Sequence, residues 1–117
     1  MIVGIGIDIV SPKKMEEAVS RWGEAFLERV FNPEEIAPLQ KGKIYYQRLA
    51  ARFAAKEAVI KSLSKKYSLA LRDIVITNLP NGAPRCRFKK DIDAGILISL
   101  SHIEHYAVAT AVAQNRS

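Results

Sequence analysis

The longest helical segment of the sequence is KIYYQRLAARFAAKEAVIKSLSKK, which covers residues 43–66. It contains no Gly or Pro and is rich in Ala, Leu, Lys and Arg, a composition that favours one uninterrupted α-helix. Near the N-terminus, residues 2–10 (IVGIGIDIV) are β-branched and apolar apart from one acid, which predicts a buried strand. The fold is therefore expected to combine one long helix with a sheet.

Shorter helices are predicted between these two segments. Ser11 followed by Pro12 is typical of a helix start, because the hydroxyl caps the first turn and proline fits its first position. Capping residues and breakers then divide the segment into three pieces. The expected pieces are 12–22, with Met15, Val19 and Trp22 on one apolar face, then 24–31, then a third helix that Asn32-Pro33-Glu34-Glu35 starts and Pro38 and Gly42 interrupt.

Strands dominate the C-terminal part of the chain. The pair Asn81-Gly82 is a hairpin signal, and the Ala83-Pro84 that follows predicts a turn longer than two residues. Residues 106–113 are rich in Ala and compatible with a helix, but alternating β-formers favour a strand. The order strand, helices, strands predicts an α+β fold, a single domain over 1–117 with an antiparallel sheet packed against one long and several short helices. The strands expected here are 73–79, 85–89, 96–101 and 106–113.

Composition excludes several classes of protein. The chain has 117 residues, of which 49% are hydrophobic, too many for a disordered chain. No apolar run approaches the ~20 residues of a membrane-spanning helix. Cys86 has no partner in the chain for a disulfide. Met1 leads directly into the first strand without the pattern of a signal peptide. We therefore expect a cytoplasmic globular protein that does not bind a membrane.

Positive charge is concentrated in one segment. The chain has 18 Lys and Arg against 12 Asp and Glu, and between residues 41 and 66 there are eight cations but only one acid, Glu57. Such a segment attracts acidic partners. The charge alone is compatible with a solvated helix face, a phosphate-bearing cofactor, nucleic acid or an acidic protein.

Two carboxylates stand out from their surroundings. Asp8 lies inside an apolar strand, where a carboxylate either accepts hydrogen bonds from backbone amides or binds a hard cation such as Mg²⁺. Glu57 lies among cations on the long helix and is spaced for an ion pair with Lys61. Alternatively, Asp8 and Glu57 together hold Mg²⁺, phosphate oxygens complete its coordination, and Lys61 offsets charge that develops during phosphoryl transfer.

Three more residues have a structural and a functional interpretation. His102 ends a strand beside two serines and is either a hydrogen-bonded core residue or a group that contacts phosphate. Gly4 and Gly6 lack the third glycine of a dinucleotide-binding fingerprint. These glycines are instead expected to let another backbone segment approach the strand closely.

Five segments form a specific combination, in which the block Arg52–Ala58 is the most distinctive. The segments are GIGIDIV at 4–10, FLERVF at 26–31 with Glu34-Glu35, RFAAKEA at 52–58 with Lys61, NGAP at 81–84, and SLSH at 99–102 followed by Tyr106-Ala107. Together they resemble the short bacterial type of 4′-phosphopantetheinyl transferase, the holo-[acyl-carrier-protein] synthases. The resemblance extends over nearly the whole chain, in the expected order.

The resemblance implies a reaction and a set of site residues. Family members transfer 4′-phosphopantetheine from coenzyme A to a serine hydroxyl of apo acyl carrier protein, release adenosine 3′,5′-bisphosphate and support fatty acid biosynthesis. It implies that Asp8 and Glu57 hold Mg²⁺, which also binds the coenzyme A pyrophosphate, and that Lys61 contacts phosphate. Glu35 matches a further acid of the catalytic site. The residues expected to bind coenzyme A are Arg52, Lys61, Lys65, Gly82, Pro84 and His102.

Family members of this length are homotrimers with active sites at subunit interfaces, and the resemblance implies the same here. The carrier protein is acidic, so the basic segment and Lys13, Lys14 and Arg21 are expected to bind it. Two positions depart from the family pattern. Residues 62–66 stand in place of a Gly-rich turn after Lys61. Relatives often carry Arg where this chain has Lys13 and Lys14, and lysine keeps the charge but lacks the bidentate hydrogen bonding of a guanidinium.

Two other functions are compatible with the sequence. A basic nucleic-acid-binding α+β module would use Tyr45, Tyr46 and Phe53 interleaved with cations, although their helical spacing is more typical of core residues. A structural subunit of a larger assembly would use the apolar first strand and predicts no binding of coenzyme A. The transferase is the preferred interpretation, and nucleic acid is not expected as a partner.

Overall fold

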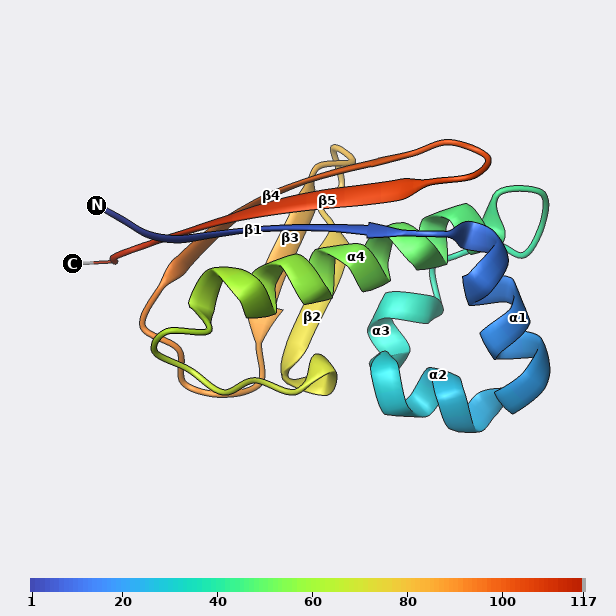
Figure 1. Ribbon diagram of the computed structural model, residues 1–117, viewed down its shortest axis with the longest axis horizontal. Coiled ribbons are helices and arrows are strands. Elements are labelled where there is room, and N and C mark those ends of the chain that lie inside the picture. The colour runs from blue at the N-terminus through green and yellow to red at the C-terminus, as the bar shows by residue number, and fades with distance from the viewer. Residues whose placement is uncertain (117) are drawn as a thin grey trace.

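A three-stranded antiparallel sheet packs against one long helix in the computed structural model, which describes residues 1–116 (Figure 1). The sheet has the order β1-β5-β4, with β1 at Ile2–Val10, β4 at Gly95–His102 and β5 at Ala107–Gln114. The helix, α4, spans Tyr45–Leu63 and lies along one face of this sheet. The predicted α+β fold is confirmed, and the Ala-rich segment is a strand.

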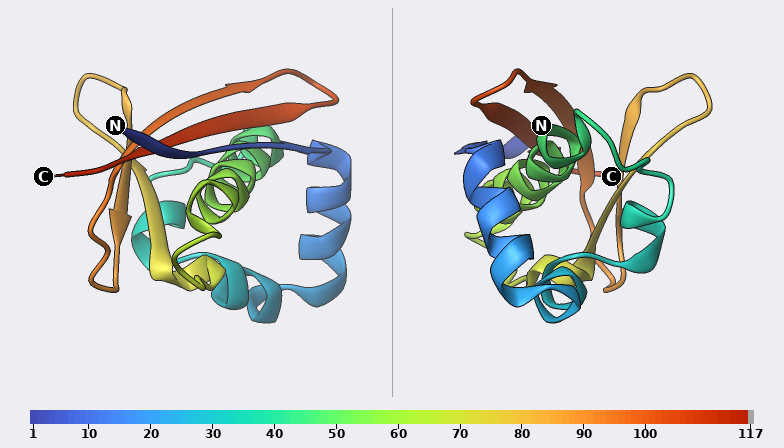
Figure 2. Two further views of the ribbon diagram at one scale, coloured as in Figure 1. Left: turned by 60° about the vertical axis from the view of Figure 1, so that its left-hand side comes forward. Right: turned by 90° about the vertical axis from the view of Figure 1, so that its right-hand side faces the viewer.

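The structure has a second sheet of two strands, whereas the sequence predicted one antiparallel sheet. The strands β2 (Ile74–Asn78) and β3 (Pro84–Phe88) pair with each other and not with the three-stranded sheet. The turn between them covers residues 79–83, which confirms that it is longer than two residues. This turn projects from the body of the molecule (Figure 2).

Three short helices connect β1 to α4. Ser11 accepts a hydrogen bond from the backbone N–H of Lys14 at 3.2 Å, so the predicted cap of α1 is present. Trp22 does not share the buried face of Met15, as its side chain is 60% exposed, because α1 ends there and the chain turns at Gly23. No helix within residues 1–116 is long and apolar enough to cross a membrane. The helices are α1 (Pro12–Trp22), α2 (Glu24–Val30) and α3 (Pro33–Ile36).

Alanines form the contact between the sheet and α4. The residues of β5 that face the helix are all alanine, and they meet alanines of α4 in one core cluster. Small side chains on both surfaces allow the helix backbone to lie close to the sheet, which fixes the position of every side chain at the edge of this contact. The alanines that the two elements contribute to this cluster are Ala109, Ala111 and Ala113 of β5 and Ala54, Ala55 and Ala58 of α4.

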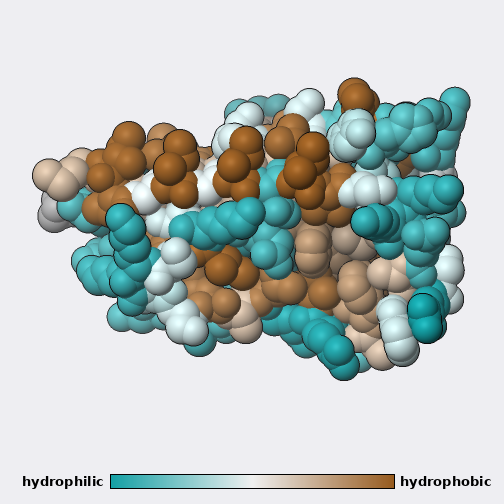
Figure 3. Space-filling model, in the orientation of Figure 1, coloured by the Kyte–Doolittle hydropathy of each residue, from teal (hydrophilic) through white to brown (hydrophobic). Residues whose placement is uncertain are grey.

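The prediction that residues 2–10 form a buried strand is half right. β1 is an edge strand of the sheet, and side chains alternate between its two faces. One face turns toward α4, but no element among residues 1–116 covers the other, where Ile5, Ile7 and Ile9 are 73%, 59% and 62% exposed. These isoleucines belong to the row of apolar side chains along β1 that Figure 3 shows. We call this surface, together with Leu97 of β4, the outer sheet face.

Candidate active site

Two glycines bring β1 into backbone contact with α4. A Cβ atom added to Gly4 would lie 1.8 Å from the carbonyl oxygen of Ser62, and one added to Gly6 would lie 2.0 Å from that of Ala58. Only glycine permits this approach, because the obstructing atoms are backbone. The expectation of close backbone approach at these glycines is confirmed. Its consequence is that Asp8, two residues after Gly6, lies beside the exposed edge of α4.

Asp8 contacts Lys61 of α4 at this edge and lies near enough to Glu57 for the two charges to interact. The ammonium of Lys61 donates to Asp8 Oδ1 at 3.2 Å and to the carbonyl oxygen of Ile7 at 2.9 Å. Lys61 therefore pairs with Asp8 rather than with Glu57, the partner that helical spacing offers. The pKa of Glu57 is raised, first by burial and then by the charge of Asp8, while Lys61 lowers it. Asp8, Glu57 and Lys61 thus form one cluster, which we call the edge cluster.

The edge cluster has the chemistry of a magnesium site. It brings two hard oxygen donors together, and their mutual repulsion is a cost that a divalent cation would relieve. No group of three or more His, Cys, Asp or Glu side chains within residues 1–116 could hold a metal by itself. Two carboxylates are sufficient for Mg²⁺ when substrate phosphates and water supply the remaining ligands. The donor set therefore fits Mg²⁺.

A cavity of about 500 Å³ lies between α4, β4 and the β2–β3 hairpin. Four residues predicted to bind coenzyme A line it. His102, at the end of β4, is held through Nδ1 by the Oε1 atom of Gln47 on α4, at 2.9 Å. Arg48 adds a second cation from α4 to the lining. The four predicted residues in the lining are Arg52, Gly82, Pro84 and His102.

Arg52 supplies the cavity with a buried cation. Its side chain donates to the carbonyl oxygen of Ile76 at 2.6 Å and to Asn78 Oδ1 at 2.7 Å, and the residue is 6% exposed. Burial is the main reason that the pKa of Arg52 is lowered. Within residues 1–116, no carboxylate lies in ion-pair range of this guanidinium. A buried charge that meets only neutral acceptors is stabilised further by an anion.

The edge cluster and the cavity lie on opposite sides of α4. Arg52 and Lys61 are nine residues apart on this helix, and at about 100° per residue their side chains leave the helix in opposite directions. The structure therefore does not bring the predicted coenzyme A residues together within one chain. Lys65 lies in neither group, since it lines a separate hollow of about 150 Å³ at the C-terminal end of α4.

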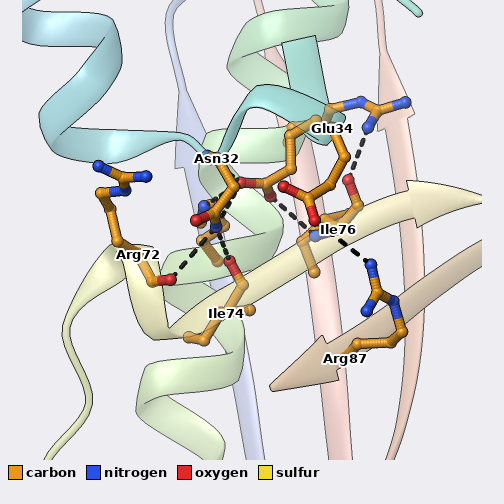
Figure 4. A network of polar contacts seen from close by, with 9 residues as sticks. Asn32, Glu34, Arg72, Ile74, Ile76 and Arg87 are labelled. Carbon is orange, nitrogen blue, oxygen red and sulfur yellow. Dashed lines mark hydrogen bonds and ion pairs between the residues drawn. The ribbon is translucent and has the colours of Figure 1, made fainter. Parts of the chain in front are cut away.

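Glu35 lies apart from the edge cluster, in the interior. Both Glu35 and Lys56 are fully buried, and the ammonium of Lys56 donates to Glu35 Oε1. Glu35 also accepts hydrogen bonds from the backbone N–H groups of Asn32 and Ile76, at 2.8 and 2.7 Å. Figure 4 shows the network around Asn32 and β2 to which these bonds belong. We call this group the core cluster.

The core cluster does not fit the predicted catalytic role of Glu35. A carboxylate held by Lys56 and two backbone donors away from solvent is not available to a substrate hydroxyl. Lys56 is likewise buried, and its ammonium is engaged by Glu35 rather than exposed to a substrate. The sequence did contain a signal of this structural role. Asn32-Pro33-Glu34-Glu35 is a helix start, and Glu35 at its third helical position accepts from the backbone N–H of the capping residue Asn32.

The aromatic residues of the nucleic-acid alternative are largely part of the core. Tyr45 is 5% exposed, and Tyr46 and Phe53 are half-buried against the same apolar cluster. Two of the eight cations of the basic segment, Arg52 and Lys56, are buried as well. The segment therefore does not present one continuous basic face with aromatic rings for stacking on bases.

The residues predicted to bind the carrier protein are exposed on α1. Lys13, Lys14 and Arg21 all face solvent, and the guanidinium of Arg21 lies over the ring of Trp22, 5.1 Å from its centroid. Glu16 and Glu17 are exposed on the same helix, so its net charge is small. Any attraction of an acidic partner to α1 therefore depends on which side of the helix the partner meets.

Two carboxylates and a lysine on one side of α4, with a cation-lined cavity on the other, fit a protein that acts on phosphate-bearing substrates. The comparison with protein families agrees: residues 4–111 match the model described as the 4′-phosphopantetheinyl transferase superfamily. The chain belongs to this superfamily and is therefore a transferase.

Comparison with individual relatives indicates which members of the superfamily the chain resembles. The chain is 40% identical, over 96% of its length and 98% of the other's, to a holo-[acyl-carrier-protein] synthase of Thermodesulfovibrio yellowstonii. Its fold is similar to that of the Bacillus anthracis holo-(acyl-carrier-protein) synthase in complex with CoA (3′,5′-ADP), with a TM-score of 0.85, 32% identity and 98% of each chain covered. The Helicobacter pylori enzyme in complex with coenzyme A gives a TM-score of 0.83 and 33% identity, with 94% of this chain and 99% of the other covered. This chain is similar to holo-[acyl-carrier-protein] synthases.

Proposed function

We propose that this protein transfers 4′-phosphopantetheine from coenzyme A to a serine hydroxyl of apo acyl carrier protein and releases adenosine 3′,5′-bisphosphate. The observation that carries the proposal is the edge cluster, in which Asp8, Glu57 and Lys61 meet across the contact of β1 with α4. This arrangement occurs in a member of the transferase superfamily whose relatives are named as holo-[acyl-carrier-protein] synthases.

Asp8 and Glu57 would hold Mg²⁺ in this reaction. Bound there, Mg²⁺ would neutralise pyrophosphate oxygens of coenzyme A, and phosphoryl transfer depends chiefly on positioning and charge stabilisation of that kind. Lys61 would contact a phosphate oxygen and offset charge that develops in the transition state, since its ammonium is already beside Asp8. The burial of Glu35 removes it from the candidates for the base that takes the serine proton.

The cavity would take the nucleotide end of coenzyme A. Arg52, Arg48 and His102 supply positive or hydrogen-bonding groups, and Gly82 and Pro84 form the wall opposite α4. The guanidinium of Arg52 is the strongest argument for this assignment, because its two hydrogen-bond acceptors are neutral and a phosphate would give it an ion pair. We assign Lys65 a weaker, long-range attraction for the same phosphates, since it lies outside this cavity.

Copies of the chain would complete one another's active sites. Edge cluster and cavity lie on opposite sides of α4, so one coenzyme A can reach both only if they come from different chains. The outer sheet face supplies an interface, as an uncovered apolar surface of this kind marks a contact with another protein. We propose a homotrimer in which the edge cluster of one subunit faces the cavity of the next.

The carrier protein would dock beside α1, where Lys13, Lys14 and Arg21 are exposed. Such charges chiefly raise the association rate and select an acidic partner. A protein with this activity would serve fatty acid biosynthesis in the cytoplasm, as a single transferase domain.

The proposed reaction is tested by intact-mass spectrometry of an apo acyl carrier protein incubated with this protein, coenzyme A and Mg²⁺. We expect the carrier to gain one phosphopantetheine group, and we expect no gain when the metal is chelated. No gain with a folded protein and several carriers, combined with no binding of coenzyme A in a titration, would refute the proposal.

The shared site is tested by mixing two inactive variants. Glu57→Gln removes the edge cluster of a subunit, and Arg48→Ala with His102→Ala weakens its cavity. If sites form between subunits, refolding the two variants together produces some sites with both halves intact, and activity returns. If each site belongs to one chain, the mixture stays as inactive as the separate variants, and the composite site is wrong.

A further inference from the structure

We infer that Asn78 is a positioning residue for Arg52: its neutral amide aims the guanidinium at the cavity without cancelling its charge, so the charge stays available to a phosphate of the nucleotide. The inference rests on the proposed function, which places the nucleotide end of coenzyme A in this cavity.

Both acceptors that orient Arg52 are uncharged. The guanidinium donates through Nη1 to the carbonyl oxygen of Ile76, at 2.6 Å, and through Nη2 to Asn78 Oδ1, at 2.7 Å. A carboxylate at position 78 would orient the guanidinium equally well, but it would form an ion pair and remove the attraction for a second anion. The amide separates these two effects, because it fixes direction without adding a negative charge of its own.

The second end of the same amide fixes the opposite wall of the cavity. Asn78 Nδ2 donates to the carbonyl oxygen of Gly82 at 2.8 Å, within the turn that joins β2 to β3. Gly82 has a φ of 91°, a conformation that favours glycine, and together with Pro84 it lines the cavity that Arg52 also lines. One side chain that both accepts and donates therefore sets the position of the turn relative to α4.

Substitutions at position 78 separate charge from structure. Asn78→Asp keeps an acceptor for Arg52 and adds the negative charge that should compete with phosphate. Asn78→Ala removes both hydrogen bonds but adds no negative charge beside the guanidinium. Both variants lose the donation to Gly82, so this loss is common to the two. A purely structural role predicts that Ala is the more harmful change, because Asp retains the bond to Arg52. The positioning role predicts the reverse order for binding of an anion.

The matched control is Asn81→Asp, on the same turn. Asn81 Oδ1 accepts from the backbone N–H of Ala83 at 3.0 Å, a bond that a carboxylate preserves, and it makes no contact with Arg52. This variant adds an identical charge to the same hairpin. It therefore reports how much of any effect is due to net charge rather than to the contact with the guanidinium.

The experiment is a calorimetric titration of each full-length variant with adenosine 3′,5′-bisphosphate at constant Mg²⁺, with melting temperatures measured in parallel. We expect Asn78→Asp to weaken binding at least about tenfold, since a hydrogen bond to a charged group contributes that much. Asn78→Ala should weaken it less, and Asn81→Asp less than about threefold. Melting temperatures of the two Asp variants should agree within about 3 °C.

Two results would overturn the inference, and they are distinguishable. Equal affinities for Asn78→Asp and Asn81→Asp, or a larger loss for Asn78→Ala than for Asn78→Asp, would show that Asn78 does not protect the charge of Arg52. Failure of the unaltered protein to bind adenosine 3′,5′-bisphosphate would instead refute the assignment of the cavity to the nucleotide, and the role of Asn78 with it.

Discussion

Two lysines of α4, five residues apart, each meet a carboxylate from another part of the chain. Lys56 pairs with Glu35, and both side chains are inaccessible to solvent. Lys61 pairs with Asp8, and these side chains are 53% and 20% exposed. The chemistry of the two pairs is the same, but their surroundings differ. The core cluster around Lys56 joins α3, α4 and β2, whereas the edge cluster around Lys61 is open to a substrate.

The positions of the two clusters explain why Lys56 and Glu57, adjacent residues of the block Arg52–Ala58, have different roles. Lys56 and Glu57 are neighbours in the sequence, yet about 100° separates their directions on the helix. One points into the interior and the other to the edge, so the motif anchors the helix with one residue and offers a ligand with the next. The buried ion pair, with its hydrogen bonds made within the protein, stabilises the fold. The partly exposed carboxylates of the edge cluster repel each other and are available to bind a ligand.

The largest effect on stability is expected from breaking the core cluster. Lys56→Met leaves Glu35 charged and buried without its cation, which should cost about 3–5 kcal/mol of unfolding free energy. Urea denaturation measures it, with Lys43→Met as the control, because Lys43 is exposed and makes no ion pair within residues 1–116. Equal costs for the two variants would show that the core pair is not what anchors α4.

The edge cluster should respond in activity rather than in stability. Asp8→Asn or Glu57→Gln should lower the transfer rate about 10²- to 10³-fold, because the developing charge loses its preorganised stabilisation. Magnesium affinity, measured by titration in the absence of substrate, should fall in parallel, and Asp91→Asn, at an exposed position between β3 and β4, should change neither. Transfer at the normal rate by either variant would exclude the proposed metal site.

Forcing β1 and α4 apart should lower the unfolding free energy by less than the loss of the core cluster does. Gly6→Ala places a Cβ atom against the carbonyl oxygen of Ala58, and such overpacking costs about 1–3 kcal/mol. It also moves Asp8 away from Glu57, so activity should fall more than stability does. Gly95→Ala is the control, since its Cβ would meet only the side chain of Gln114 at 3.6 Å. Identical behaviour of the two variants would mean that this contact does not position the site.

The smallest effect on stability is expected from Lys61→Met. The half-exposed pair with Asp8 is screened by solvent, so its loss should change the unfolding free energy by less than about 1 kcal/mol. The transfer rate should nevertheless fall clearly, and a rate equal to that of the unaltered protein would remove Lys61 from the proposed mechanism. Set against Lys56→Met, this variant shows directly that the two lysines differ in role.

Local sequence signals were reliable wherever the cause was local. The cap at Ser11, the long helix rich in Ala and the extended turn at Asn81-Gly82 each depend on neighbours in the chain, and each was predicted correctly. The division of the strands into two sheets was not predicted, because pairing of β2 with β3 alone depends on packing between distant segments. The roles of the site residues stay predictions.

Sequence by itself determined the α+β fold, the family and the residue types available for chemistry, because these follow from local propensity, pattern and motif. Only the tertiary structure decided what each charge does. Glu35 and Lys56 are in the core because α3 and β2 close over them, and Asp8 faces Glu57 because two glycines let backbones touch. The outer face of β1 is exposed because α4 packs on the opposite face of the sheet and no element within residues 1–116 packs on this one. Burial is a property of the packed chain, so the alternation of apolar residues could not reveal which face would remain open.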